Sequence, residues 1–245
     1  MGIKYQVNEK FFDKWSLEMA YILGYLYADG SLEDASYLRG KYLRVSSIDR
    51  ESILKIKHLL NSKHKIVKKK NLSGNQKNCY LLRIGSHVLY NRLIELGLFP
   101  NKSLSMKFPD MPEKYLRFFV LGYFDGDGCV MVRKERNKKG AFVLKGLRVV
   151  FTCGSIDFLE KLAKRINNAI NTKQLKIYNG HRSYMLSYST DDSVLIFKFI
   201  YNISKPIFLK RKFVKFCDYF DLRINRKDKY VCKIIERFNL GRVAK

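Results

Sequence analysis

The sequence predicts an α+β fold that is built twice. An apolar run closing on Asp-Gly occurs at 22–30 as ILGYLYADG and again at 120–128 as VLGYFDGDG. After each motif come a polar stretch, an alternating strand-like run and a segment with helical period. Two short strand-like runs and a last helical segment close each half. Each half is therefore expected to be helix, two strands, helix, two strands, helix, which predicts two pseudo-symmetric αββαββα domains.

In the first half, polar residues mark the starts and turns of the expected elements. Asp49 is the expected N-cap of the second helix, and Ser73-Gly74-Asn75 is a turn sequence between two strand-like runs. The expected elements are, in order, a helix ending at Asp29, a strand at 42–47, a helix at 53–60, strands at 65–70 and 80–84, and a helix at 88–96.

The second half repeats this order with a short insertion in 133–146. Ser155 is the expected N-cap here, and Asn179-Gly180 is the expected hairpin turn. The expected elements are a helix ending at Asp127, a strand at 147–152, a helix at 158–170, strands at 175–178 and 184–188, and a helix at 193–202.

The domain boundary is expected where prolines interrupt the pattern. Segment 102–114 contains Pro109 and Pro112, so it is the expected linker between domain 1–104 and domain 105–245. The basic tail at about 223–245 carries apolar residues at helical spacing. We expect it to form a helix packed on the second domain rather than an extra clamp on a partner.

Each motif helix carries small residues four positions apart. Gly24 and Ala28 in the first motif, and Gly122 and Gly126 in the second, each lie on one helix face. Such faces let two helix backbones approach closely. Each helix could instead pack its small residues on the sheet of its own domain, but the duplication favours a helix–helix interface.

If the helices cross there, Asp29 and Asp127 lie side by side. Like charges about 5 Å apart repel by roughly 3 kcal/mol at an effective dielectric constant of about 20. The negative ends of both helices and the apolar surroundings add to this cost. A hard divalent cation removes it, because carboxylates, backbone carbonyls and water form an oxygen site suited to Mg2+. The expected ligands are Asp29, Asp127 and the carbonyls of Ala28 and Gly126.

Another acid, Asp125, has no counterpart in the first motif and is given a secondary place. The string Asp125 to Gly128 has the start of a calcium loop. Position twelve of such a loop would be Arg136 where Glu is required, so that interpretation is discarded.

The charge balance favours a polyanionic partner. Lys and Arg number 48 against 22 Asp and Glu, which gives a formal net charge of +26. Nucleic acid is the first candidate, and an anionic membrane is a weak second, since no apolar stretch approaches the roughly 20 residues that span a bilayer. The start of the chain does not have the pattern of a signal peptide. Five scattered cysteines and four scattered histidines make a disulfide framework or structural zinc unexpected.

Basic residues recur in corresponding parts of the two halves, on the expected strand pairs. Two-stranded ribbons fit the major groove, where Arg and Lys read guanine and other cations hold phosphates. The base-reading candidates on one sheet face are Lys41, Arg44, Ser46 and Arg83 in the first half, and Arg133, Arg148, Lys176 and Arg182 in the second. Further DNA-binding candidates, mostly for phosphates, are Lys68, Lys69, Lys70, Arg136, Lys138 and Lys139.

The paired motifs resemble those of the LAGLIDADG homing endonucleases, in the single-chain form with two motifs. The resemblance covers nearly the whole chain. It implies two domains whose curved antiparallel sheets lie along the DNA major groove, with a central two-helix interface. It implies that Asp29 and Asp127 bind metal and that each serves cleavage of one strand. The implied product is a double-strand break with short 3′ overhangs at a long target site.

The resemblance also implies auxiliary residues. A lysine following the last helix of each domain lies near the metals, which corresponds to Lys102 and Lys212, with Lys210 left open as an alternative. A polar residue at the end of the second strand orients water. Ser47 stands there in the first half, and Thr152 or Cys153 in the second. A plain strand-end cap is an equally good interpretation of Ser47.

Three functions remain open at this level. The leading one is a Mg2+-dependent DNA endonuclease, with Mn2+ or Ca2+ able to replace Mg2+ in binding. It is expected to act as a monomer on double-stranded DNA, inside a bacterial cell or an organelle and without a membrane. The alternatives are an RNA-binding maturase that assists intron splicing, and a non-catalytic DNA-binding regulator. Retention of both motif acids favours cleavage.

Overall fold

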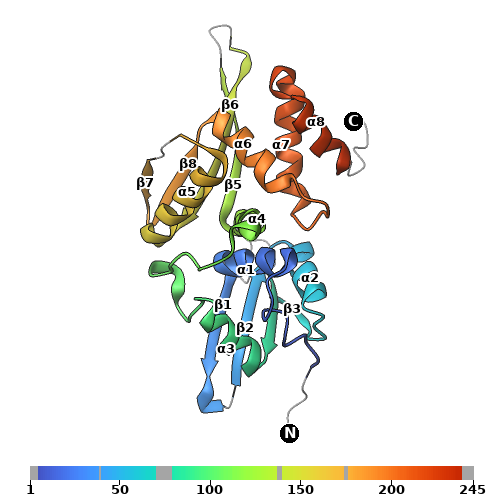
Figure 1. Ribbon diagram of the computed structural model, residues 1–245, viewed down its shortest axis with the longest axis vertical. Helices are drawn as coiled ribbons and strands as arrows, with labels where there is room; N and C mark the ends of the chain where they lie inside the picture. The colour runs from blue at the N-terminus through green and yellow to red at the C-terminus, as the bar shows by residue number, and fades with distance from the viewer. Residues whose placement is uncertain (1–4, 39, 70–78, 137–139, 174–175, 239–245) are drawn as a thin grey trace. The chain divides into compact units, whose positions relative to one another are not determined.

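The computed structural model describes residues 5–38, 40–69, 79–136, 140–173 and 176–238 (Figure 1). By its internal contacts the chain forms two compact units, Met1–Gly126 and Asp127–Lys245. Each unit contains one four-stranded antiparallel sheet, and the two sheets have the same strand order, β1-β2-β4-β3 and β5-β6-β8-β7. The predicted α+β fold with two repeated sheets is therefore confirmed.

The first unit contains four helices and four strands among its described residues. They are α1 (Leu17–Asp29), β1 (Gly30–Ala35), β2 (Gly40–Ser47), α2 (Arg50–Leu59), β3 (Ile66–Lys69), β4 (Cys79–Gly85), α3 (His87–Glu95) and α4 (Leu116–Asp127). Short 3-10 turns lie at Ser36–Leu38, Lys102–Leu104 and Glu113–Tyr115. One face of the sheet packs its buried residues, such as Leu43, Val45 and Ile84, into the core.

Helix α1 is stabilised by the N-cap Ser16 and by the burial of its own largely apolar residues. The Ser16 hydroxyl accepts the N–H of Met19 at 3.0 Å. All residues from Met19 to Tyr27 are buried, as expected of a helix that is apolar on every side. Gly30 then takes up an extended backbone and starts β1, so Asp29 is the last helical residue.

The second unit repeats the arrangement and adds two helices. Its elements are β5 (Gly128–Arg136), β6 (Phe142–Cys153), α5 (Ile156–Ile170), β7 (Ile177–Gly180), β8 (Ser183–Tyr188), α6 (Thr190–Tyr201), α7 (Lys210–Leu222) and α8 (Lys229–Arg237). Strands β5 and β6 are 9 and 12 residues long, against 6 and 8 for β1 and β2. The insertion seen in the sequence thus lengthens this hairpin, with a bulge between Arg133 and Lys134.

Local expectations were met at the caps and missed at one turn. Asp49 and Ser155 cap α2 and α5, accepting the N–H groups of Glu51 and Phe158. The expected turn at Asn179-Gly180 is wrong, because both residues pair within the β7–β8 ladder and the turn is formed by the next two residues. Arg182 takes the left-handed conformation there, with φ of 57°.

Helix α7 was not expected from the sequence. Its apolar residues Phe213, Phe216, Cys217 and Phe220 follow helical spacing, so a signal was present. The rings of Phe213, Phe216 and Phe220 pack around Phe197 of α6. Helix α8 lies within the predicted tail and buries Val231 and Ile234, and Phe238 after it contacts the rings of Phe208 and Phe213.

Candidate active site and nucleic-acid interface

Helices α1 and α4 touch through their backbones at Gly24 and Gly122. A Cβ atom built on Gly24 would lie 2.0 Å from the carbonyl oxygen of Phe119. A Cβ atom built on Gly122 would lie 1.9 Å from the carbonyl oxygen of Tyr21. Neither position has room for any side chain. The small residues predicted for a helix interface therefore lie in reciprocal contact, and α4 packs with the first compact unit for this reason.

The second pair of small residues brings the contact to the ends of the motifs. A Cβ atom on Gly126 would lie 2.3 Å from the Cβ of Ala28 and 3.5 Å from Oδ2 of Asp29. Asp29 is half-buried and ends α1. Asp127 follows Gly126 directly, ends α4 and is exposed. Glycine at 126 thus lets the backbone of α4 pack against Ala28, next to the carboxylate of Asp29.

Each motif acid is followed by a glycine whose carbonyl accepts a buried lysine. The ammonium group of Lys102 donates to Gly30 O at 2.8 Å, and that of Lys212 donates to Gly128 O at 2.6 Å. These lysines are only 5% and 4% exposed. Burying an ammonium group costs several kcal/mol unless it is hydrogen-bonded and near negative charge. Two such groups at corresponding places indicate a functional constraint on the site.

The structure distinguishes Lys212 from its neighbour Lys210. Lys210 starts α7 and is exposed, whereas Lys212 lies in the first turn with its side chain turned into the unit. Only Lys212 of the two reproduces the contact that Lys102 makes, since its ammonium group reaches the carbonyl after the motif acid.

Asp125 lies inside the helix pair instead of at its end. It is buried, and the hydroxyl of Tyr21 donates to its Oδ2 at 2.8 Å. Burial lowers the pKa of the nearby Lys55, while the charge of Asp125 acts in the opposite direction. Asp125 therefore joins α4 to α1, a role that its sequence position did not reveal.

Ser47 lies beside the first motif and also caps the end of its strand. Its Oγ accepts the N–H of Asp49 at 3.1 Å. Tyr25 of α1 is buried, and its hydroxyl interacts with Ser47, Ser52 and Asp29. The pKa of Tyr25 is raised well above its usual value, mainly by burial. The phenol therefore stays protonated. Tyr25 links Ser47 to the motif acid, a connection that sequence reasoning missed.

In the second unit Cys153 takes the place that Ser47 has in the first. Its Sγ accepts the N–H of Ser155 at 3.4 Å, two residues on, as Ser47 does. Strand register agrees, because Gly30 pairs with Val45 and Gly128 pairs with Phe151, two residues before each. Thr152, the other residue expected at this place, is half-buried and matches Ser46 on the open face of the sheet.

The open face of the first sheet carries an ionic cluster, which we call the Glu33 cluster, made of Glu33, Arg44 and Arg83. Glu33 pairs with Arg83 at 2.7 Å and with Arg44 at 3.4 Å. The guanidinium of Arg83 also lies 3.3 Å from the ring centroid of Tyr42. The hydrogen bond from Arg83 is the main cause that holds the pKa of Glu33 below its usual range. A groove of about 440 Å³ runs from this cluster to Lys102.

Two first-half candidates lie on the other side of their strands. Lys41 is odd-numbered on β2, so it cannot share a face with Arg44 and Ser46. Its ammonium group instead reaches Asn91 of α3 at 3.3 Å and lies over the ring of Tyr90. Lys68 pairs with Tyr80, which lies on the same sheet face as the buried Leu82. The side chain of Lys68 is nevertheless exposed. The prediction that Lys41 shares the open face is wrong.

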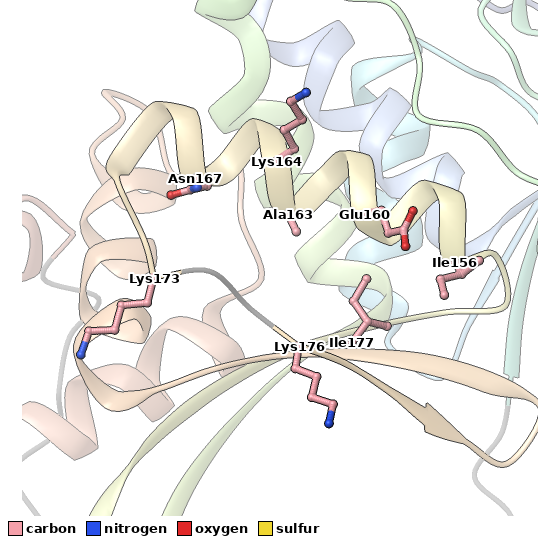
Figure 2. Close-up of a pocket in the computed structure, with 8 residues that line it drawn as sticks. All are labelled: Ile156, Glu160, Ala163, Lys164, Asn167, Lys173, Lys176 and Ile177. Carbon is pink, nitrogen blue, oxygen red and sulfur yellow. The ribbon is translucent and has the colours of Figure 1, made fainter.

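The open face of the second sheet carries Arg133 and Arg148, as expected from their alternation on β5 and β6. Lys176 precedes β7, and its side chain points away from α5 while Ile177 points toward that helix (Figure 2). Arg182 lies in the hairpin turn and not on a strand. Arg136 ends β5 with its guanidinium over Phe142. Lys70, Lys138 and Lys139 lie outside the described residues.

Two kinds of feature do not occur in the described part of the chain. No group of three or more His, Cys, Asp and Glu side chains gathers there as a ligand set. None of the helices seen in these residues has the length and apolar character needed to cross a membrane.

These features define a two-motif protein in which each unit contains a four-stranded sheet of the same strand order. The family model for "LAGLIDADG endonuclease" matches residues 120–224, and that for "LAGLIDADG-like domain" matches residues 16–97. The chain belongs to the LAGLIDADG family.

Solved structures support the fold assignment. The homing endonuclease I-WcaI, bound to its DNA recognition sequence, matches with a TM-score of 0.56 and 14% identity over 84% of this chain and 90% of that one. The meganuclease I-AabMI, bound to uncleaved DNA, matches with a TM-score of 0.54 and 16% identity. That match covers 89% of this chain and 97% of the meganuclease chain. I-DmoI, in complex with DNA and Mn, matches with a TM-score of 0.51 and 18% identity. That match covers 76% of this chain and 97% of the I-DmoI chain. At such identities the likeness shows the fold alone.

A curated relative matches part of the sequence. The reverse gyrase of Methanocaldococcus jannaschii is 26% identical over 163 residues, which are 65% of this chain. The match spans 9% of the length of that protein.

Proposed function

We propose that this chain is a site-specific DNA endonuclease that depends on a divalent metal, with Asp29 and Asp127 as metal-binding acids. The observation that carries the proposal is the repeated contact of a buried lysine with the carbonyl after each acid, Lys102 with Gly30 and Lys212 with Gly128. A fold kept only for binding has no evident need of two buried ammonium groups there. Family membership and the net charge of +26 support a nucleic-acid substrate.

The residues present fit a hard divalent cation. Asp29 offers a half-buried carboxylate at the negative end of α1, and Gly126 of α4 packs beside it. Asp127 and the carbonyls of Ala28 and Gly126 complete an oxygen donor set that suits Mg2+. I-DmoI has been solved with DNA and Mn and with DNA and Ca, which supports a divalent ion. When bound, such an ion acidifies water and stabilises the leaving oxygen of a phosphodiester.

The other residues of the site have roles that follow from their positions. The ammonium groups of Lys102 and Lys212 place positive charge beside each acid, where they can donate to a phosphate oxygen. The protonated phenol of Tyr25 donates to Asp29 and so fixes the orientation of that carboxylate. We propose that each acid serves cleavage of one strand, which gives a double-strand break with 3′ overhangs.

The open sheet faces are the proposed DNA-binding surfaces. A two-stranded ribbon is narrow enough for the major groove, and β5 with β6 forms a ribbon longer than its counterpart. Because one chain contains both motifs, we propose that it acts as a monomer on double-stranded DNA, inside the cell.

Cleavage of a selected target tests this proposal. A duplex recovered from a randomised library by binding in Ca2+ is then incubated with Mg2+. The parent chain is expected to cut both strands, while Asp29→Asn and Asp127→Asn bind but leave at least one strand intact. Asp157→Asn, which changes an exposed acid at the start of α5, is the matched control and is expected to cut normally.

Two results would contradict the proposal. If both Asn variants cut both strands at the parental rate, the acids are not the catalytic pair. If the parent binds one sequence tightly but never cuts it with any of several divalent metals, a non-catalytic DNA-binding regulator is favoured instead.

A further inference from the structure

We propose that the connection between α7 and α8 forms a site for one DNA backbone phosphate, beside the β5–β6 hairpin of the second unit. The site deepens the proposed function and depends on it, because the phosphate belongs to the duplex that the sheets bind. It is a pocket of about 180 Å³, which we call the Arg223 pocket. Its lining residues are Lys145, Thr190, Tyr219, Arg223, Asn225 and Arg226.

Near this pocket, β6 has a strand neighbour on only one of its two edges among the described residues. Strand β5 pairs with β6 over residues 142–151, whereas β8 pairs with it over 149–153 only. Before Val149, side chains from the described helices take the place of a strand. The hydroxyl of Thr190 in α6 accepts the N–H of Leu147 at 3.1 Å and donates to the Leu147 carbonyl at 3.2 Å. The backbone of Leu147 is therefore hydrogen-bonded without a further strand.

Helix α7 runs along the hairpin and carries Arg223 to the outer part of β6. In the first turn of α7, Lys212 donates to the carbonyl of Gly128 at 2.6 Å. Directly after the last residue of the helix, Nη2 of Arg223 donates to the carbonyl of Leu144, also at 2.6 Å. Leu144 pairs with Lys134, which lies six residues beyond Gly128 on β5. The contact holds the guanidinium group of Arg223 against β6.

Arg223 keeps its positive charge in this position. Among the described residues its guanidinium group bonds a backbone carbonyl and forms no ion pair, and its fork has further N–H donors for a second acceptor. The other two cations of the pocket are paired. Arg226 contacts Asp191, and Lys145 contacts Glu135 at 3.2 Å. These four side chains are exposed, and exposed ion pairs are weak, so a phosphate competes well for both cations.

Size and lining favour a phosphate group over a larger ligand. The pocket volume of about 180 Å³ is well below the roughly 300–1,000 Å³ of pockets that enclose small molecules. Three cations line the pocket, and the amide group of Asn225 adds further N–H donors. N–H donors that carry positive charge form the strongest hydrogen bonds to phosphate oxygens. The pocket therefore has the donor set that one phosphate needs.

The pocket adjoins the face that we propose for DNA binding. Lys145 and Arg133 both pair with Glu135, and Arg133 lies on the open face of the second sheet. A two-stranded ribbon in the major groove has a sugar–phosphate backbone along each of its edges. A phosphate from one wall of the groove therefore reaches the pocket while the open face contacts the bases. Phosphate contacts of this kind fix the position of the protein without reading the sequence.

Binding to duplexes with single methylphosphonate linkages tests the site, in Ca2+ and on a target selected with the full chain. Each such linkage replaces one charged phosphate oxygen by a methyl group. The parent chain is expected to lose about tenfold in affinity at one linkage, as when a hydrogen bond to a charged group is lost. Arg223→Gln is expected to bind the unmodified duplex about tenfold more weakly and to be indifferent to that same linkage.

Two further variants control for charge and for support of the hairpin. Lys233→Gln removes one exposed positive charge from α8, outside the pocket, and is expected to keep the parental response at every linkage. Arg223→Lys keeps the charge and is expected to retain part of the response. If Arg223 only supported the hairpin, Arg223→Gln would weaken binding while the loss at each linkage stayed parental.

The salt dependence of binding gives a second readout that needs no selected target. On a duplex of arbitrary sequence, Arg223→Gln is expected to reduce the slope of log Kobs against log salt concentration by about 1, because one phosphate contact is lost. Lys145→Gln is expected to change the slope in the same direction. Lys233→Gln is expected to leave it unchanged.

The outcomes separate the phosphate site from the function on which it rests. An unchanged salt slope in Arg223→Gln, or equal losses at every linkage in the parent and in this variant, overturns the site and leaves the endonuclease proposal standing. A parent chain that binds its target and never cuts it overturns the endonuclease proposal and leaves the site standing. If no specific target is recovered, the salt slope alone decides the site.

Discussion

The ammonium group of Lys102 donates a hydrogen bond to the carbonyl oxygen of Gly30 at 2.8 Å, and the second unit repeats this contact between Lys212 and Gly128 at 2.6 Å. Both lysines are buried, and both acceptors directly follow a motif acid. The contact therefore recurs at the corresponding place in both units. It ties a distant segment to the end of each motif.

Replacing either lysine by methionine is expected to slow cleavage without unfolding the chain. Methionine keeps most of the buried volume and removes only the charge, so Lys102→Met and Lys212→Met should each lose about 100-fold or more in single-turnover rate. Lys210→Met removes an exposed charge in the same turn of α7 and should cut normally. Parental rates for both buried variants would show that these lysines serve packing alone.

Adding one methyl group at the helix crossing is expected to destabilise the first unit. The Cβ of Gly24→Ala would lie 2.0 Å from a backbone carbonyl, which cannot move as a side chain can. We expect a loss of at least about 2–3 kcal/mol in the free energy of unfolding, measured by urea titration. Gly140→Ala is the comparison, because no atom lies within 4 Å of its Cβ and only its φ of 77° opposes alanine. A smaller loss at Gly24 than at Gly140 would contradict the close packing.

The bond between Tyr21 and Asp125 is expected to matter for stability. Tyr21→Phe removes the hydroxyl that donates to a buried carboxylate at 2.8 Å. The expected cost is about 1.5–3 kcal/mol, the range for hydrogen bonds to charged groups. Tyr37→Phe, which alters an exposed phenol, should change the free energy of unfolding by much less. Equal effects of the two substitutions would remove this role from Asp125.

Stability is expected to fall in mildly acidic solution because of His64. This side chain is buried, and its Nε2 accepts the N–H of Gly85 at 3.1 Å, which only the neutral ring can do. Burial is the main cause that lowers the pKa of His64 in the folded chain. The unfolded chain therefore binds a proton first as the pH falls below about 6.5, and folding stability drops through that window.

The His64 effect is measurable as the slope of unfolding free energy against pH. His64→Gln should flatten the slope between about pH 5 and 6.5, whereas His181→Gln, at an exposed turn, should leave it unchanged. An unaltered slope in His64→Gln would assign the acid sensitivity to other groups.

Much of the fold was readable from local patterns. The two motifs, the caps Asp49 and Ser155 and the repeated order of strands and helices rest on neighbours in the sequence, and the structure contains them. The sequence-based prediction is wrong where a contact with a residue distant in the sequence determines the local structure. The turn moved from Asn179-Gly180 to the next two residues because cross-strand pairing, not turn propensity, set the register. The face of Lys41 is a different case, because its odd position on β2 by itself separates it from Arg44 and Ser46.

The candidate site divides in the same way. The sequence by itself determined which residues are repeated, Asp29 and Asp127 with their glycines, because repetition and helical spacing are properties of the chain order. Only the tertiary structure decided that Lys212 and not Lys210 reaches a motif carbonyl, that Cys153 and not Thr152 matches Ser47, and that Asp125 belongs to the helix contact. Each of these facts depends on a hydrogen bond or a strand register set by packing, and the free energy of such contacts is not encoded in any short segment.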